Sequence, residues 1–418
     1  MRKKIKQFAE QNLPQYMQEK ADRMNLFEED VPPYTPVELP FGPGCDPAAV
    51  RKEILATFAR EMYGEIPPCC DELSFSLRSE GSAFDGLAIR KEIDITCRHN
   101  GITRIFHLLL YTPAQAKGKV PCFFTLNFKG NHTTTFDPEV TFFPFTPYTK
   151  SPYAWLSDGR ASESERGIKA FQWEYETVLK AGFASATICY FDIFPDHPEG
   201  YAESIMPMFY SEEEYNSPQR KSAAISAWSW GVSRALDVLT QLPEIDAERI
   251  AVAGLSRLGK VALWAGANDE RIKLSISICS GTGGAKMTRR YFGENMEWLE
   301  NWRTYWFVPG FFQYVCRDTE IPFDQQQMMA CIAPRKMLVA SATNDAYADP
   351  KGEFLATKAA SKAWEFYGKS AWDEDIAFPE GGKAAGNADV HYFRRIGEHS
   401  FTPENWQDIL EFVKNSGF

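Results

Sequence analysis

From residue 120 onward, short β-rich runs alternate with helical patterns along the chain. We predict strands over residues 120–128, 184–191, 250–253, 274–278 and 337–340. Helices are predicted over residues 222–242, 257–267 and 352–367, and a last helix is predicted after Pro403. Parallel strands need such long crossover connections, and helices on the crossovers cover both faces of the sheet. The pattern therefore predicts an α/β fold with a mostly parallel, doubly covered sheet.

The N-terminal part of the chain has a different character. Residues 1–45 are polar and then proline-rich, which predicts an extension that wraps onto a domain formed by residues 46–418. We expect a helix over residues 48–63, followed by strands at 93–95 and 104–111 that enter the sheet in antiparallel fashion. Two aromatic-rich segments interrupt the later alternation, and we expect them to wall a ligand site beyond the strand ends: residues 142–167 and 286–327.

Composition excludes several classes of partner. The chain has 45 Lys and Arg residues against 56 Asp and Glu, which gives a formal net charge of −11. An acidic chain is a poor match for a phosphate backbone or an anionic membrane, so neither is expected as a partner. The nine cysteines are scattered without a Cys-x-x-Cys pair, so neither a disulfide framework nor a metal site is predicted. The first residues lack the apolar centre of a signal peptide, so the expected location is cytoplasmic.

The strongest catalytic signal lies between Ile250 and Lys260. A buried strand runs into Gly254-Leu-Ser256 and directly into a helical pattern, a context in which a sharp turn raises a serine hydroxyl above the sheet. The helix dipole and the N–H of Arg257 would then face the oxyanion of an attacked carbonyl. The second glycine of the usual motif is displaced by one residue. A plain N-cap role for Ser256 is the alternative interpretation.

A serine nucleophile needs a histidine base and a carboxylate that orients the base. In α/β-hydrolases the acid and then the histidine follow the serine, which leaves His391 and His399 among the six histidines. His399 precedes the final helix in a loop and is the preferred base, whereas His391 also fits an exposed strand position. Asp345 follows a predicted strand and is expected to hold the imidazole tautomer. Asp349 is better explained as a helix N-cap.

Two further features allow a functional and a structural interpretation. Lys260 lies four residues after Ser256 on the same helical face, where its ammonium can reach a substrate; a surface lysine is the alternative. Trp298, Trp302 and Trp306 recur every four residues. A sugar-binding platform is one interpretation, but a helical stripe at this spacing favours packing.

Six segments together resemble the glucuronoyl esterases of carbohydrate esterase family 15, bacterial type. They span about residues 120 to 415 in the order expected of that family: Leu126–His132, Trp228–Leu236, Gly254–Lys260, Ser280–Gly284, Ala348–Phe354 and Gly397–His399. The Gly-x-Ser-Arg-x-Gly-Lys string is much more specific than a bare Gly-x-Ser. The resemblance implies an α/β-hydrolase three-layer sandwich with an N-terminal extension, and it implies no metal or organic cofactor.

The implied activity is that of a serine esterase. Its substrate would be a glucuronate ester or a glucuronoxylan fragment, cleaved between a (4-O-methyl)glucuronic acid branch of xylan and a lignin alcohol. In this scheme Ser256 is the nucleophile, His399 is the base, and Arg257 stabilises the oxyanion through its N–H and its side chain. Lys260 and Glu294 match positions that bind sugar hydroxyls in the family.

The resemblance also implies where this chain departs from other members. Tyr347 stands where many members carry a sugar-contacting tryptophan, and Gln325 is a weaker candidate for a hydroxyl contact. Members with a glutamate before Ser-Gly-x-Gly-Gly use it as the triad acid, whereas this chain has Cys279 there. Other members, largely bacterial, use the aspartate that Asp345 matches.

Two other functions stay open at this point. The first is a carbohydrate acetylesterase, because one fold supports many substrates. The second is a non-catalytic carbohydrate-binding pseudoenzyme, which Cys279 and Tyr347 would suit. The intact set of Ser256, His399 and Asp345 weighs against the second possibility.

Overall fold

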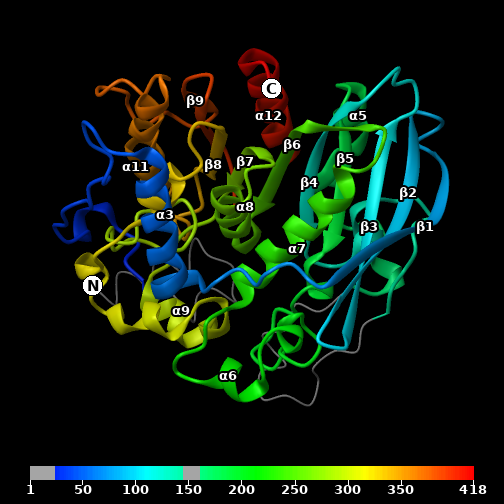
Figure 1. The fold of residues 1–418 in the computed structure, drawn as a ribbon. Coiled ribbons are helices and arrows are strands. Elements are labelled where there is room, and N and C mark those ends of the chain that lie inside the picture. Colours follow the sequence, from blue (N-terminus) through cyan, green and yellow to red (C-terminus); the bar gives the residue numbers. More distant parts are fainter. Residues whose placement is uncertain (1–23, 145–160) are drawn as a thin grey trace.

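The computed structural model describes residues 24–144 and 161–418, and its strands form one ten-stranded sheet (Figure 1). The order across the sheet is β1-β2-β3-β5-β4-β6-β7-β8-β10-β9. In chain order the strands are β1 Glu72–Ala83, β2 Ala88–His99, β3 Ile102–Pro113, β4 Val120–Asn127, β5 Ala184–Cys189, β6 Ile245–Leu255, β7 Ile272–Ile278, β8 Lys336–Ala342, β9 Lys383–Gly386 and β10 Val390–Arg395.

The centre of the sheet is parallel. Strands β5, β4, β6, β7, β8 and β10 pair in parallel as successive neighbours. All eight residues of β4 are buried, as expected of a strand that is covered on both faces. Strands β1, β2 and β3 form an antiparallel meander that joins β5, and β9 pairs antiparallel to β10 at the other edge. The predicted parallel sheet with an antiparallel entry is confirmed.

Helices cover both faces of the sheet. They are α3 Pro47–Phe58, α4 Ala170–Trp173, α5 Tyr175–Lys180, α6 Glu212–Asn216, α7 Ala224–Leu239, α8 Arg257–Asn268, α9 Met296–Trp302, α10 Gln325–Ala330, α11 Pro350–Ser361 and α12 Pro403–Ser416. Successive strand residues enter different cores: Val252 joins the core formed with α7 and α8, whereas Ala251 and Ala253 join the core formed with α12. This three-layer arrangement is the predicted α/β-hydrolase sandwich.

Several elements differ in length from the prediction. The helix expected over residues 48–63 is α3 followed by a π-helical turn at Ala59–Tyr63. The helix expected over residues 352–367 is α11 followed by a 3-10 turn at Lys362–Tyr367. The strands expected at 93–95 and 104–111 are parts of the longer β2 and β3.

The described part of the predicted extension packs against the second aromatic-rich segment. The Gly293 amide donates to the carbonyl of Asn25 over 2.7 Å. The Glu28 carboxylate forms an ion pair with Lys351 at 2.6 Å and a second one with Arg290. The division of the chain at residue 45 stays a prediction. Most of the first aromatic-rich segment, 142–167, lies outside the described residues.

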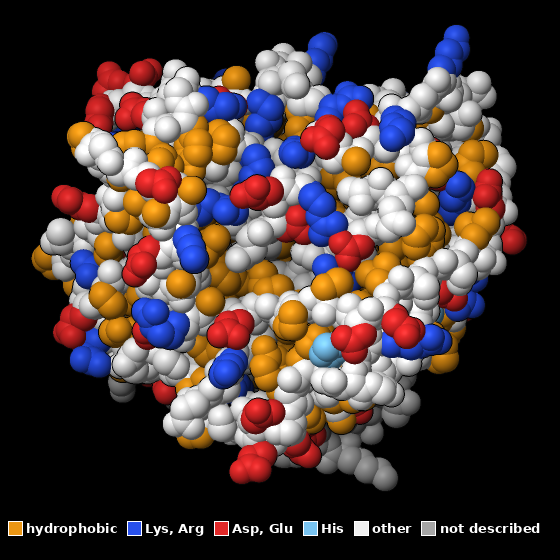
Figure 2. Space-filling model, viewed as in Figure 1, with side chains coloured by type: hydrophobic (Ala, Val, Ile, Leu, Met, Phe, Trp, Pro, Cys, Tyr) orange, Lys and Arg blue, Asp and Glu red, His pale blue; other side chains and the backbone are white. Residues whose placement is uncertain are grey.

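The surface carries charges of both signs. On the face shown in Figure 2, Lys and Arg side chains are interspersed with Asp and Glu side chains and with hydrophobic ones. No helix within residues 24–144 and 161–418 is both long enough and apolar enough to cross a bilayer.

Candidate active site

Ser256 occupies a sharp turn between β6 and α8. Its backbone has φ 59° and ψ −127°, a left-handed conformation that costs an L-residue roughly 1–3 kcal/mol and is concentrated at functional sites. A Cβ at Gly254 would lie 2.0 Å from the carbonyl oxygen of Leu258, so the tight turn requires glycine there. The Ser256 side chain makes no capping hydrogen bond to α8. The turn thus has the geometry of a nucleophile elbow, and the plain N-cap interpretation is not supported.

His399 and Asp345 meet beyond the carboxyl ends of the parallel strands, where Ser256 also lies. Asp345 follows β8, and His399 lies in the loop between β10 and α12. His399 Nδ1 lies 2.6 Å from Asp345 Oδ2, a hydrogen bond between a one-third exposed imidazole and a buried carboxylate. The alternative base, His391, is on β10, and its Nε2 lies 2.9 Å from Oδ1 of Asp408. Of the two histidines, His399 is therefore the one paired with Asp345.

The surroundings of His399 favour its charged form. Burial opposes the charged imidazolium, but the charge and hydrogen bond of Asp345 outweigh it. The carboxylates of Glu353 and Glu294 act in the same direction. The net effect raises the pKa of His399 above its ordinary value, as expected of a base that must hold a proton during the reaction.

Cys279 lies directly beside this pair. It follows β7 with φ 49° and is 2% exposed. Burial, with the charges of Asp345 and Glu353, raises the pKa of the Cys279 thiol, which is therefore neutral near pH 7. Ligand atoms of Cys279, Asp345 and His399 all lie within 4.8 Å of one another, and no other such His/Cys/Asp/Glu group occurs within the described residues. A neutral thiol cannot replace the charge of a carboxylate, which leaves Asp345 as the partner of the histidine.

Lys260 is buried rather than exposed. Its side chain is 2% exposed, so the surface-lysine interpretation is wrong. The ammonium donates to the carbonyls of Ser280 and Thr282 over 2.7 and 2.6 Å and to Oε2 of Glu294 over 2.7 Å. Burial lowers the pKa of Lys260, and the charge of Glu294 opposes that shift. These three bonds match the three donors of an ammonium group, so Lys260 holds the loop after β7 as well as the Glu294 carboxylate.

The two weaker substrate-binding candidates have different positions. Tyr347 is partly exposed and packs edge-on against Trp298, with ring centroids 5.1 Å apart. Burial and the charge of Glu294 raise the pKa of Tyr347, so its hydroxyl stays neutral. Gln325 is only 1% exposed, and its Nε2 donates to Tyr63 Oη over 3.0 Å. The structure thus places Tyr347 beside Glu294. Gln325, by contrast, lies in the protein interior.

Three cations surround one indole ring close to Ser256. The ring centroid of Trp306 lies 5.0 Å from Arg257 Cζ, 5.2 Å from Arg303 Cζ and 5.7 Å from Lys260 Nζ. Trp306 is 3% exposed, Trp298 is 5% exposed and Trp302 is partly buried against the core, so the three tryptophans pack instead of forming an open platform. Lys260 and Arg257 form ion pairs with the carboxylates of Glu294 and Asp196, so these cations belong to a network that contains both signs of charge. A guanidinium held in this network can stabilise negative charge that develops on a substrate.

Comparisons with known proteins agree with this geometry. The family model for fungal glucuronyl esterases matches residues 202–368. A carbohydrate esterase from an unknown prokaryotic organism, MZ0003, is 36% identical over 87% of this chain and 83% of its own length. A promiscuous esterase of carbohydrate esterase family 15 from a marine bacterial metagenome superposes with a TM-score of 0.82 and 35% identity, covering 94% of this chain and all of the other. This chain belongs to carbohydrate esterase family 15.

A third relative extends the comparison. The glucuronoyl esterase from Solibacter usitatus superposes with a TM-score of 0.84 and 35% identity, over 93% of this chain and all of the other. Membership of family 15 makes this protein a carboxylic ester hydrolase. The predicted family and the predicted enzyme class are both confirmed.

Sequence reasoning gave no role to Glu353, a buried carboxylate of this family 15 esterase. Glu353, on α11, accepts the amides of Ser280 and Gly281 over 2.6 and 3.0 Å and the hydroxyl of Ser341 over 2.5 Å. Burial, with the charge of Asp345, raises the pKa of Glu353 to about 7. Glu353 therefore ties the loop after β7 to the end of β8. It lies inside the quoted segment Ala348–Phe354, but spacing alone gave it no role.

The buried Lys260–Glu294 pair permits a stability prediction. Lys260→Met keeps most of the stem but removes the ammonium, which leaves Glu294 and two carbonyls without their donor. Breaking a buried ion pair in this way is expected to lower the free energy of unfolding by about 3–5 kcal/mol. Denaturant unfolding measures this loss. An unchanged unfolding midpoint would contradict the pairing described above.

The same variant separates packing from substrate binding. If Lys260 also contacts sugar hydroxyls, KM should rise more for a methyl glucuronate ester than for a simple aryl ester, measured where the variant is folded. Equal changes in both KM values would assign Lys260 to the structure alone.

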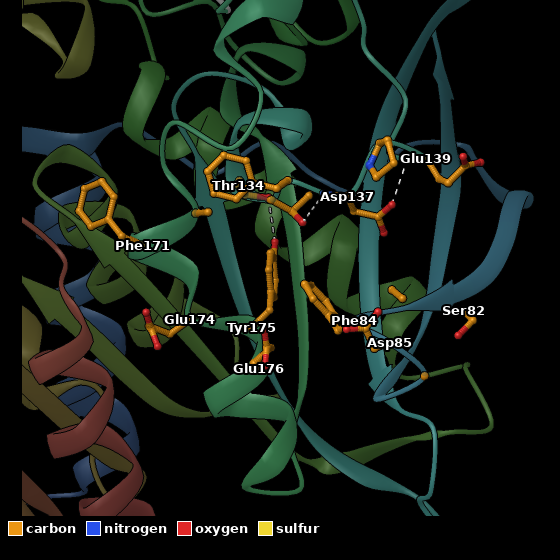
Figure 3. A pocket seen from close by; sticks show the side chains of 16 residues that line it. Ser82, Phe84, Asp85, Thr134, Asp137, Glu139, Phe171, Glu174, Tyr175 and Glu176 are labelled. Atoms are coloured by element: carbon orange, nitrogen blue, oxygen red, sulfur yellow. Dashed lines mark hydrogen bonds between the residues drawn. The ribbon is translucent and has the colours of Figure 1, made fainter.

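An open cavity of about 720 Å³ lies apart from these residues (Figure 3). It is bordered by the β1–β2 turn and by α4 and α5, and its lining includes Phe84, Phe171 and Tyr175. Tyr175 and Thr134 both line it, and their hydroxyls are hydrogen-bonded over 2.9 Å. None of the predicted catalytic or substrate-binding residues lines this cavity.

Proposed function

We propose that this esterase hydrolyses esters of (4-O-methyl)glucuronic acid on xylan with lignin alcohols, using Ser256, His399 and Asp345 as a catalytic triad. The observation that carries the proposal is the hydrogen bond between Asp345 and His399 beyond the carboxyl ends of the parallel strands. Ser256 occupies its strained turn after a neighbouring strand of the same sheet. The substrate class is supported by the 4-O-methyl-glucuronoyl methylesterase from Cerrena unicolor, which is 33% identical over 43% of this chain and 36% of its own length.

The first half of the reaction forms an acyl-enzyme. Ser256 Oγ attacks the uronoyl ester carbonyl while His399 Nε2 takes the hydroxyl proton, and Asp345 stabilises the resulting imidazolium. The carbonyl oxygen becomes negatively charged, and the Arg257 N–H at the start of α8 and its guanidinium stabilise that charge. The C–O bond to the alcohol then breaks, and His399 returns the proton to the leaving oxygen.

The second half reverses these roles with water. His399 takes a proton from water, whose oxygen attacks the acyl carbonyl, and the bond to Ser256 Oγ breaks. The proton returns to Ser256, and free uronic acid leaves. Every proton in this cycle is carried by His399, so the scheme requires neither a metal nor an organic cofactor.

Substrate recognition is assigned to the polar groups around Trp306. Glu294 is proposed to contact sugar hydroxyls, with Tyr347 beside it in the position of the family tryptophan. Lys260 is a proposed contact only if one of its three internal hydrogen bonds is released, because those bonds use all three of its donors. Gln325 is a proposed contact only if the loop after β7 opens, because its amide is buried. The cytoplasmic location and the glucuronoxylan fragment as substrate stay predictions.

The shifted pKa of His399 sets the direction of the pH dependence. The base must be neutral, and a raised pKa keeps the imidazole protonated to a higher pH. We therefore expect kcat/KM to rise with pH through an apparent pKa above the ordinary histidine value of about 6.5. Asp345→Asn should move that apparent pKa downward, because it removes the neighbouring charge. If the apparent pKa of kcat/KM on the acid side were the same in this variant as in the wild type, the pairing of Asp345 with His399 would be contradicted.

A substrate comparison tests the proposal against an acetylesterase. The purified enzyme is assayed with a methyl glucuronate ester, with the matched methyl galacturonate ester, and with an aryl acetate. The proposal predicts the highest kcat/KM for the glucuronate ester. Preference for the aryl acetate, with no turnover of either uronate ester, would favour the acetylesterase.

A further inference from the structure

The side chain of Arg257 is held in a cage. Its guanidinium lies between two aromatic rings, with Cζ 5.0 Å from the centroid of Trp306 and 5.5 Å from that of Phe128. Phe128 follows β4 directly, and Trp306 belongs to the second aromatic-rich segment. The edge of the cage is closed by Asp196, which forms an ion pair with Arg257 Nη1. A long, flexible side chain next to the nucleophile is thus fixed by three separate segments.

The Asp196 carboxylate is bound by several side chains at once. It is 0% exposed, follows β5, and accepts hydrogen bonds from three neighbours besides Arg257: Tyr190 Oη at 3.0 Å, Tyr305 Oη at 2.8 Å and Trp306 Nε1 at 2.7 Å. Burial raises the pKa of Asp196, but the charges of Arg257 and Arg303 and the hydrogen bonds lower it by more. The carboxylate is therefore charged and is held by four partners.

These contacts link Asp196 to the chemistry through Arg257. Stabilisation of an oxyanion depends on donors that already point at the developing charge, because reorientation during the reaction costs free energy. An arginine side chain free to rotate would lose rotamer entropy on each such event. A guanidinium fixed before the substrate arrives avoids most of that loss.

We propose that Asp196 is a positioning residue that fixes the Arg257 guanidinium for stabilisation of the oxyanion formed at Ser256. Asp196 does not touch the substrate in this account. The inference rests on the proposed function, because it assigns the Arg257 side chain to the reaction catalysed by Ser256.

Asp196→Asn is the primary variant. It keeps the size of the side chain and one oxygen that can accept from both Tyr305 and Trp306, but it removes the charge that holds Arg257. We expect kcat to fall roughly 10–100-fold, less than the loss of a whole oxyanion donor, with KM changed less than about threefold. Asp318→Asn is the matched control, because Asp318 is a 2%-exposed carboxylate in the second aromatic-rich segment and accepts the Met296 amide. That control should lower stability without lowering kcat.

A double-mutant cycle separates positioning from general support of the fold. Kinetics with a methyl glucuronate ester are measured for Arg257→Met, Asp196→Asn and the double variant, with unfolding followed in parallel. If Asp196 acts through Arg257, the double variant should fall within about threefold of Arg257→Met alone. Multiplicative losses, or an Arg257→Met variant with wild-type kcat, would overturn the inference.

A milder variant covers the case in which Asp196→Asn does not fold. Tyr305→Phe removes one of the hydroxyls that bind Asp196 and keeps the ring. It should lower kcat about two- to fivefold in the wild-type background, and this effect should vanish in the Arg257→Met background. The same loss in both backgrounds would overturn the inference. Wild-type turnover of glucuronate esters tests the proposed function separately, so the two failures are distinguishable.

Discussion

Ser256→Ala is expected to lower kcat for a glucuronate ester by roughly 10⁵–10⁶-fold while the fold is preserved. The loss is large because the hydroxyl forms the covalent bond to the acyl group, and no neighbouring group supplies that oxygen. Stability should change little, because alanine and serine meet the same backbone strain at φ 59° and the side chain caps nothing. Steady-state kinetics and thermal unfolding of the same preparation measure both quantities.

The control for this variant is another buried serine. Ser229 on α7 is fully buried and donates to the carbonyl of Ile225 over 2.9 Å, away from the triad. Ser229→Ala should keep kcat within about twofold of wild type, since it loses only one local hydrogen bond. Turnover by Ser256→Ala close to that of Ser229→Ala would remove Ser256 from the mechanism.

Asp345→Asn is the second large effect, and we expect kcat to fall by roughly 10⁴-fold. The amide presents either an N–H or an uncharged oxygen to His399 Nδ1, so it no longer fixes the tautomer or stabilises the imidazolium. A second aspartate–histidine pair provides the control: Asp408→Asn removes the charge beside His391 and should leave kcat nearly unchanged. If Asp408→Asn lowered kcat strongly while Asp345→Asn stayed active, His391 and not His399 would be the base.

Cys279 provides an independent check on the acid. Cys279→Ala should reduce kcat far less than Asp345→Asn, because the buried thiol is neutral. Glutamate at position 279 in the Asp345→Asn background should restore part of the activity, since the thiol, Asp345 and His399 lie within 4.8 Å. If Cys279→Ala or Asp349→Asn is the crippling variant instead, the third triad member is assigned wrongly.

Local patterns in the sequence predicted the parts of the molecule that short-range physics controls. The strand–turn–helix around Ser256 and the N-cap role of Asp349, whose side chain accepts the Gly352 amide, depend on neighbouring residues. The central strands were visible because continuous apolar runs mark burial on both faces. The edge strand β9 and its neighbour β10 were not predicted, apart from the exposed strand position considered for His391, because β9 is short and mostly exposed and β10 mixes apolar with charged residues.

Long-range partnerships could not be predicted in the same way. Asp196 meets Arg257, Tyr305 and Trp306 only because the loop after β5 and the second aromatic-rich segment fold over the turn at Ser256. The rule that found Asp345, an acid after a strand end, would also have flagged Asp196, but nothing in the sequence names its partners. The burial of Lys260 was hidden for the same reason, since its acceptors lie 20 or more positions away.

The most direct test of the central claim is covalent labelling of the nucleophile. The intact enzyme is treated with a fluorophosphonate probe, and the adduct is located by peptide mass spectrometry, with and without excess methyl glucuronate ester. We predict one adduct on Ser256, slower labelling in the presence of the ester, and no adduct in Ser256→Ala. An unlabelled wild-type enzyme that still hydrolyses the ester, or an adduct on a different residue that abolishes activity, would contradict the account.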